Sequence, residues 1–165
     1  KKMGGKIKIL NKRKYFGEEI GDLFVKSSNL KGIKVPAKWI TTSIDDLVVL
    51  CVAFGLAKGK SYFKAPELRF KESDRIKAMS ESLKKLGIKT ITNKDSLKIF
   101  GNPDMKTKKK IKISSNLDHR VAMTNFVAAQ ILGSNILIKG FETVTSSFPN
   151  FLKIQKKIGA KYEIK

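Results

Sequence analysis

Apolar residues follow helical spacing in four segments of the chain. The nearly unbroken apolar run over 47–57 predicts a helix that is covered on every side, and a similar helix is expected to end at Gly133. The segment 73–86 has apolar residues every three or four positions, which predicts an amphipathic helix. A last helix is expected over 149–158. Because helices that are apolar almost all round must be buried, we expect sheets outside them.

Strands are predicted where short apolar runs or period-two alternation lie between turn residues. The expected strands are 23–25, 33–35, 61–63, 97–100, 110–113 and 135–138. A pattern of a helix end, a glycine and an alternating strand occurs three times, as KKMGGKIKI (1–9), KKLGIKTIT (84–92) and KKIGAKYEI (156–164). Its glycines are expected to have a left-handed backbone, and they are Gly4, Gly87 and Gly159.

A longer repeat relates the two halves of the chain. One apolar helix follows Ser43-Ile44-Asp45-Asp46 and the other follows Asn116-Leu117-Asp118-His119, with Ser43 and Asn116 as the expected N-caps. The sequence thus predicts two copies of a unit of roughly 73 residues. We expect a single partial domain over 1–165, in which 1–10 is the tail of a preceding repeat and 11–92 and 93–165 are repeat units. Since the front of the first copy and an initiator methionine are missing, a fragment is expected.

Lysine dominates the composition and gives a formal net charge of +21. Such a charge suggests nucleic-acid binding, but only four of the 35 basic residues are arginine. The lysines cluster only at Lys108–Lys110, and no aromatic residues interleave with them. We therefore favour a solvated surface that attracts anionic substrates, with no specific nucleic-acid partner.

Other features of the composition exclude several classes of protein. The hydrophobic content of 41% argues against disorder. No apolar run is long enough to cross a membrane, so a cytoplasmic protein without a membrane partner is expected. The single cysteine, Cys51, lies in the predicted apolar helix, which excludes disulfides and cysteine metal sites.

Polar residues that could carry chemistry cluster at three predicted helix starts. The densest cluster is Lys71-Glu72-Ser73-Asp74-Arg75, and the only histidine lies in Asp118-His119-Arg120. Asp45 and Asp46 occupy the equivalent place in the other repeat. Helix N-termini suit anionic ligands, although capping and solvated charge would explain each cluster by itself. If the repeats pack side by side, the three starts converge on one anion site.

Five segments in order along the chain match the motifs of one family. They are GDLFVKSSNLKGIKV, TSIDDLVVLCVAFGLAKG, PELRFKESDRIKAMSESLKKLG, NLDHRVAMTNFVAAQILG and SSFPNFLKIQKKIGA. In these segments the chain resembles the 5-enolpyruvylshikimate-3-phosphate synthases. The resemblance implies an α/β (α+β) fold of repeated βαβαββ units with buried helices and outer sheets, of which about two of three units are present.

The resemblance also implies the transfer of an enolpyruvyl group from phosphoenolpyruvate to the 5-hydroxyl of shikimate 3-phosphate, with release of phosphate and without a cofactor or metal. Asp45 would handle the hydroxyl proton, and Glu72 would exchange a proton with the methylene carbon. Lys71 would contact the shikimate substrate and help to move protons.

The same resemblance implies a set of substrate-binding residues. Arg75 and Arg120 would hold the carboxylate and phosphate of phosphoenolpyruvate, with His119 close to that phosphate, while Lys71 and Asp45 would meet the shikimate substrate. The rest of the site would lie in the missing N-terminal domain, so the fragment alone is expected to be inactive.

The chain departs from the family pattern at several positions. Ser146 stands where one branch of the family has a phosphate-binding lysine, the segment IDDLVV lacks a usual glutamate and proline, and Pro66 replaces a common glutamate. Two alternatives stay open: a relative of UDP-N-acetylglucosamine enolpyruvyl transferase, whose motifs differ, and a basic nucleic-acid-binding module.

Overall fold

The computed structural model describes residues 1–107 and 110–164. The helices are α1 (Ala37–Ser43), α2 (Leu47–Gly55), α3 (Arg75–Lys85), α4 (His119–Leu132), α5 (Val144–Ser147) and α6 (Phe151–Lys157), with 3₁₀ turns over Pro66–Phe70 and Phe141–Thr143. The strands are β1 (Lys6–Tyr15), β2 (Glu18–Lys26), β3 (Gly59–Lys64), β4 (Lys89–Thr92), β5 (Ser96–Gly101), β6 (Ile111–Ser114) and β7 (Ile136–Lys139). The predicted mixture of helices and strands is confirmed.

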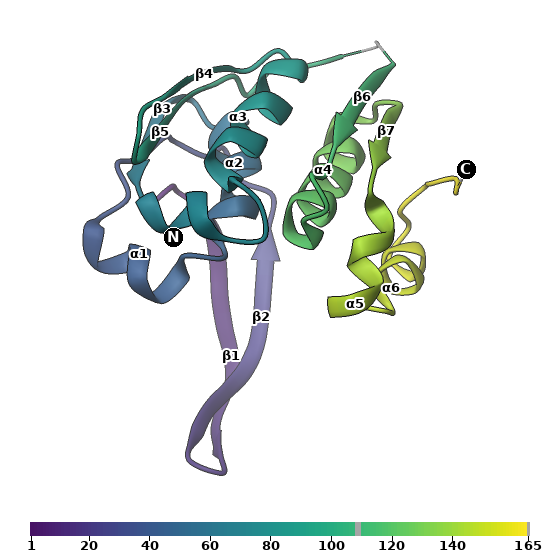
Figure 1. Cartoon of the computed structure of the whole chain (residues 1–165). Coiled ribbons are helices and arrows are strands. Elements are labelled where there is room, and N and C mark those ends of the chain that lie inside the picture. The colour runs from purple at the N-terminus through teal and green to yellow at the C-terminus, as the bar shows by residue number, and fades with distance from the viewer. Residues whose placement is uncertain (108–109, 165) are drawn as a thin grey trace.

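The strands form three separate sheets (Figure 1). β1 and β2 form an antiparallel hairpin that projects away from the helices, and its two strands are exposed along almost their whole length. β3, β5 and β4 form an antiparallel sheet in that order, and β6 pairs with β7 in parallel. The prediction of a short strand at 23–25 therefore found only the last part of β2.

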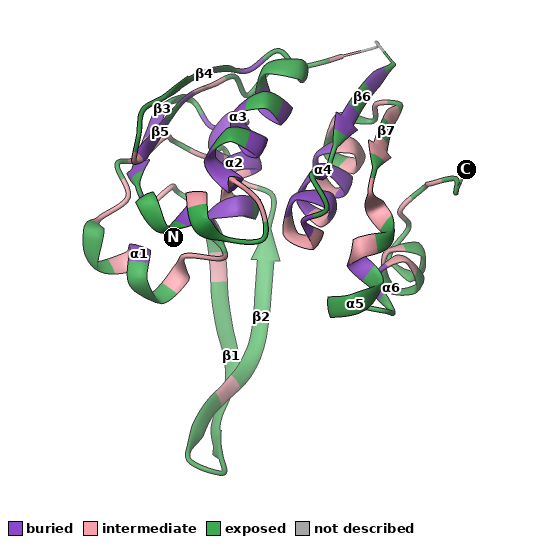
Figure 2. Ribbon diagram, in the orientation of Figure 1, coloured by how far each residue is buried: buried purple, intermediate pink, exposed green. Residues whose placement is uncertain are grey.

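The helices form the interior between the three-stranded sheet and the β6–β7 pair. α2 and α3 lie under the three-stranded sheet and share its core, which includes the fully buried Phe54, Ile76 and Leu97. α4 packs against both helices and also against β7. Figure 2 shows buried residues concentrated on the facing sides of α2, α3 and α4. The prediction of inner helices and outer sheets is confirmed for these elements.

The three predicted left-handed glycines are confirmed. Gly4, Gly87 and Gly159 have φ of +90°, +87° and +94°, as expected where each repeated pattern leaves its helix or turn. Gly133 ends α4 with φ of +57°. Cys51 is buried in α2, and burial raises the pKa of its thiol, as fits an unreactive core residue.

Two predicted strands are wrong. The segment 33–35 makes a single isolated bridge to β3, in which Val35 N donates to the Tyr62 carbonyl and Tyr62 N donates to the Ile33 carbonyl. The segment after Gly159 has no strand up to residue 164, because Lys161 pairs instead with the side chain of Gln130 in both directions. The alternating pattern was present in both cases, but 33–35 forms only this one bridge beside β3, and in the described chain no strand pairs with the segment after Gly159.

The surface lysines need a correction as well. Lys60 and Lys89 lie over the ring of Phe100, with the ammonium groups 5.6 and 5.2 Å from its centroid. An aromatic residue thus does interleave with lysines on the outer face of the three-stranded sheet, because sheet pairing brought distant positions together. Of the run Lys108–Lys110, the first two residues lie outside the described residues. Within the described chain, no helix is long and apolar enough to span a membrane.

Candidate active site

The starts of α2, α3 and α4 meet at the side chain of Arg75. This guanidinium is only 1% exposed, and it donates from Nε to Asp118 Oδ2 at 2.8 Å and from Nη1 to Asp45 Oδ1 at 2.7 Å. Nη2 donates to Glu72 Oε2 at 2.6 Å. Burial by itself would lower the pKa of Arg75, but hydrogen bonds and charge from Asp118, Glu72 and Asp45 raise it. One buried cation therefore joins the segments before three helices.

Asp118 is the buried partner that holds two of these segments together. Its carboxylate is fully buried and accepts hydrogen bonds from Arg75 and from Ser73 Oγ at 3.0 Å. It also accepts from the backbone N–H groups of Arg120 and Val121 at 2.9 and 3.3 Å, which makes it the N-cap of α4. Burial raises the pKa of Asp118, but the hydrogen bond and charge of Arg75 outweigh it and keep the pKa below its ordinary value.

The two N-caps predicted from sequence are both wrong. Asn116 lies in a left-handed turn with φ of +54°, which leaves Asp118 in the extended conformation that an N-cap requires. Ser43 is the last residue of α1, and α2 begins after Asp46 without a side-chain cap. The N-cap of α3 is Asp74, whose carboxylate accepts from Lys77 N at 2.9 Å.

Asp45 lies on the open side of the cluster among three cations. Arg75 is 2.7 Å away, Lys71 Nζ is 3.6 Å from Oδ1, and Arg120 Nη2 is 3.7 Å from Oδ2. Burial raises the pKa of Asp45, but the charges of Arg120, Lys71 and Arg75 outweigh it and lower the pKa. The side chains of Asp45, Lys71 and Arg120 remain 38%, 33% and 37% exposed, so this part of the cluster is open to an anionic ligand.

Arg69, which precedes Lys71 and Glu72, anchors the loop that carries them. Its Nη1 donates to Asp74 Oδ2 at 2.6 Å, and its other nitrogens donate to the backbone carbonyls of Lys94 and Asn93. This anchoring ties the loop to the turn between β4 and β5. Pro66, the departure from the family pattern in this region, begins the 3₁₀ turn that contains Arg69.

The predicted site residues are thus largely brought together. Asp45, Lys71, Glu72, Arg75 and Arg120 are joined by the ion pairs described above. The sixth residue, His119, begins α4 beside Arg120 and is half-buried, and within the described chain it makes no hydrogen bond or ion pair with the other five.

Sequence reasoning did not assign a role to two residues that hold the cluster together. Ser73 and Asp118 were seen as members of polar motifs, but their burial and their shared partner were not visible in the sequence. Ser146 lies in α5, where its Oγ donates to the Thr143 carbonyl. In residues 1–107 and 110–164 no three His, Cys, Asp or Glu side chains are grouped so that they could hold a metal ion.

The two lowered aspartate pKa values predict how stability depends on pH. A carboxyl whose folded pKa lies below its unfolded value of 3.8 stabilises the fold above that pH, and this contribution is lost as the pH falls through the folded pKa. The free energy of unfolding, measured by urea denaturation, should therefore decline below about pH 4 as Asp118 is protonated. The Asp118→Asn variant should show a flatter decline, and an unchanged slope would contradict the assignment.

Comparison with known proteins shows the family of the chain that carries this cluster. The family model described as EPSP synthase (3-phosphoshikimate 1-carboxyvinyltransferase) matches residues 1–154, which include every residue of the cluster. The chain belongs to the EPSP synthase family. The 3-phosphoshikimate 1-carboxyvinyltransferase of Petrotoga mobilis is 43% identical over 159 residues, which is 96% of this chain and 36% of the relative. That of Zymomonas mobilis is 39% identical and covers 99% of this chain and 37% of the relative.

Solved structures agree with the family assignment. An EPSP synthase from Acinetobacter baumannii superposes with a TM-score of 0.89 at 36% identity, covering 98% of this chain and 38% of that one. An enolpyruvyl transferase from Streptomyces tendae shares the fold, with a TM-score of 0.61 at 16% identity. The chain spans little more than a third of the length of the curated relatives it matches.

Proposed function

We propose that this chain supplies one half of the active site of an EPSP synthase. The complete enzyme would transfer the enolpyruvyl group of phosphoenolpyruvate to the 5-hydroxyl of shikimate 3-phosphate and release phosphate. The observation that carries the proposal is the group of cations around Asp45 at the meeting point of three helix starts, in which Arg75 is buried and Lys71 and Arg120 are open to a ligand. Both substrates are strongly anionic, and such a group of cations can bind their carboxylate and phosphate groups.

The cluster suggests how substrate binding would prepare the acid and base. Asp45 and Glu72 are ion-paired to Arg75, and Asp118 holds the guanidinium from its buried side. An arriving phosphoenolpyruvate carboxylate would compete for Arg75 and Arg120 and release the two carboxylates. Released from Arg75, Glu72 could take up a proton from solvent and pass it to the methylene carbon, while Asp45 accepts the proton of the attacking 5-hydroxyl.

The remaining roles follow from position. Lys71 is half-exposed beside Asp45, where its ammonium group would contact shikimate 3-phosphate and stabilise negative charge as the tetrahedral adduct forms. His119 follows the N-cap of α4 and would lie near the phosphate of phosphoenolpyruvate. Asp118 would fix the orientation of Arg75 without touching substrate.

A chimeric enzyme tests the proposal. In it, the segment of the Petrotoga mobilis relative that matches this chain is replaced by residues 1–165. We expect phosphate release by the chimera with phosphoenolpyruvate and shikimate 3-phosphate, and none with UDP-N-acetylglucosamine as acceptor. The isolated chain should release no phosphate above background, since it spans about a third of the relative. A folded chimera that is inactive with shikimate 3-phosphate, or that prefers the nucleotide sugar, would contradict the proposal.

A further inference from the structure

The outer face of the three-stranded sheet carries lysine and aromatic side chains side by side. On β3 and β5 the inward side chains, such as Ser61, Phe63 and Ile99, are buried against the helices. The alternate positions point to the opposite face, because successive side chains of a strand alternate. We call this surface the lysine–aromatic face, and it consists of Lys60, Tyr62, Lys89, Ile91, Lys98 and Phe100.

Strand register arranges this face in two rows. In the first row Phe100 lies between Lys60 and Lys89, which are its partners on the neighbouring strands. Their ammonium groups lie 5.6 and 5.2 Å from the centre of its ring. In the second row Lys98 is the cross-strand partner of Tyr62. Each aromatic ring therefore has a lysine as a direct neighbour.

The positive charge of the lysine–aromatic face is largely uncompensated. Lysine is the only charged residue type within β3, β4 and β5. Of these lysines, only Lys64 forms an ion pair within the described chain, with Asp95. The exposed Lys34 extends the face beyond β3 through its bridge to Tyr62. Such a surface attracts polyanions.

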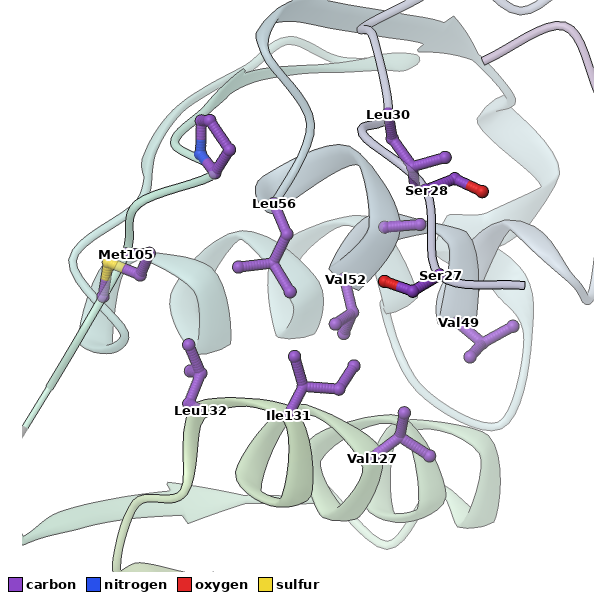
Figure 3. A pocket seen from close by; sticks show the side chains of 12 residues that line it. Ser27, Ser28, Leu30, Val49, Val52, Leu56, Met105, Val127, Ile131 and Leu132 are labelled. Carbon is purple, nitrogen blue, oxygen red and sulfur yellow. The ribbon is translucent and has the colours of Figure 1, made fainter. Parts of the chain in front are cut away.

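A second open surface, a groove between α2 and α4, has a different chemistry (Figure 3). Its volume is about 470 Å³, and apolar side chains such as Val52 and Ile131 line it together with Ser27 and Ser28. The groove is lined by no charged side chain. An anionic partner would therefore meet the lysine–aromatic face rather than this groove.

We propose that the lysine–aromatic face binds single-stranded RNA, with phosphates on the lysines and bases stacked on Phe100 and Tyr62. Stacking of a base on a ring is worth more than an exposed contact between an ammonium group and a ring. A base can therefore displace Lys60 or Lys89 from Phe100, and the displaced ammonium group can bind the adjoining phosphate. Aromatic residues on the open face of a sheet hold two or three bases in this way in one common class of RNA-binding domain.

The pairing of rings with cations favours a single strand over other polyanions. A duplex keeps its bases stacked on one another and offers mainly its phosphates, and an anionic membrane or an acidic peptide would use the lysines alone. The three strands carry lysine and no arginine, the usual reader of base edges. Because every base has a stacking face, binding should tolerate many RNA sequences.

Fluorescence anisotropy with a labelled oligouridylate of about 12 nucleotides tests the proposal on the chain of residues 1–165. The measurement reports binding alone, so it is independent of the proposed reaction. Lys60→Ala, Lys89→Ala and Lys98→Ala are combined in one variant. We expect its affinity to fall about tenfold or more at roughly 100 mM salt. The slope of log affinity against log salt should flatten by about 2, since each phosphate contact contributes about 0.7.

The matched control removes the same charge from α6, which lies away from the three-stranded sheet (Figure 1). It combines Lys153→Ala, Lys156→Ala and Lys157→Ala. We expect its affinity to change less than about twofold, because salt screens charges that lie far from the bound strand. An equal loss of affinity in both triple variants would overturn the proposal, since binding would then follow net charge alone.

A second set of variants tests the role of the rings. Phe100→Leu removes the ring but keeps an apolar side chain, and we expect about tenfold weaker binding of the oligouridylate with an unchanged salt slope. Phe100→Tyr keeps the ring and should bind as the parent chain does. Tyr62→Leu repeats the test in the second row, in case position 100 tolerates leucine poorly, and melting temperatures report whether each variant is folded.

The same variants distinguish a single strand from other anionic partners. An RNA duplex of the same sequence length and vesicles that contain phosphatidylserine should bind more weakly than the oligouridylate, and Phe100→Leu should not alter their binding. Unchanged binding of the oligouridylate by folded Phe100→Leu and Tyr62→Leu would overturn the proposal. Vesicles that bind as tightly as the oligouridylate would overturn it in favour of a membrane surface.

Discussion

Replacement of Asp118 by alanine is expected to lower the free energy of unfolding by about 3–5 kcal/mol, the typical loss when one partner of a buried ion pair is removed. Arg75 is 1% exposed and Asp118 is fully buried, so the guanidinium would lose its most buried partner without gaining water in exchange. The substitution also removes the N-cap of α4 and the acceptor of Ser73 Oγ. These losses act at the junction of two helices, so we expect the largest effect on stability of any single change in the cluster.

Urea denaturation of the isolated chain measures this loss. Asp118→Asn should cost less than alanine, because an asparagine still caps a helix well but carries no charge for Arg75. The control is Asp95→Ala, which breaks a partly exposed ion pair with Lys64 and should give a much smaller change. A loss for Asp118→Ala as small as that for Asp95→Ala would show that the buried pair does not hold the helix starts together.

The repeated helix and glycine signals were enough to predict most of the fold. The helix ends at Gly87 and Gly133 and the buried helix around Cys51 were predictable because they depend on the residues of the segment itself: glycine readily adopts a positive φ, and an apolar run is buried. The segments 33–35 and 161–164 failed because a strand needs continuous pairing with a neighbour, and alternation along one segment does not show whether that pairing forms: 33–35 makes only one bridge to β3, and in the described chain no strand pairs with 161–164. Long-range pairing is the information that a single sequence carries least clearly.

The candidate site was also predictable only in part: the motifs identified its charged members but not its helix caps or its buried contacts. The helix-start motifs named Asp45, Glu72 and Arg75 correctly as members of one cluster, because polar residues at the N-termini of buried helices share an edge of the fold. The caps were misassigned, since both Asn116 and Asp118 are acceptable cap residues and only the backbone conformation distinguishes them. The structural role of Asp118 depends on its burial, which the sequence does not report.

Glu72→Gln in the chimeric enzyme is expected to lower kcat by about 10²–10⁴-fold, the usual contribution of a general acid or base. Glutamine keeps the size of the side chain and can still contact Arg75, so the structure of the loop should persist. It cannot exchange a proton with the methylene carbon of phosphoenolpyruvate. KM for phosphoenolpyruvate should change much less than kcat, because Lys71 and Arg120 still supply the cationic part of the cluster.

Steady-state phosphate release by the chimera, Glu72→Gln and Glu81→Gln tests most directly whether this cluster is catalytic. Glu81 lies on α3, the helix that follows Glu72, but it is exposed and outside the cluster. Its glutamine variant should therefore keep the parent kcat. We predict a large fall in kcat at position 72 alone, with unchanged melting temperatures. Equal kcat values for all three proteins would contradict the assignment of the cluster to catalysis.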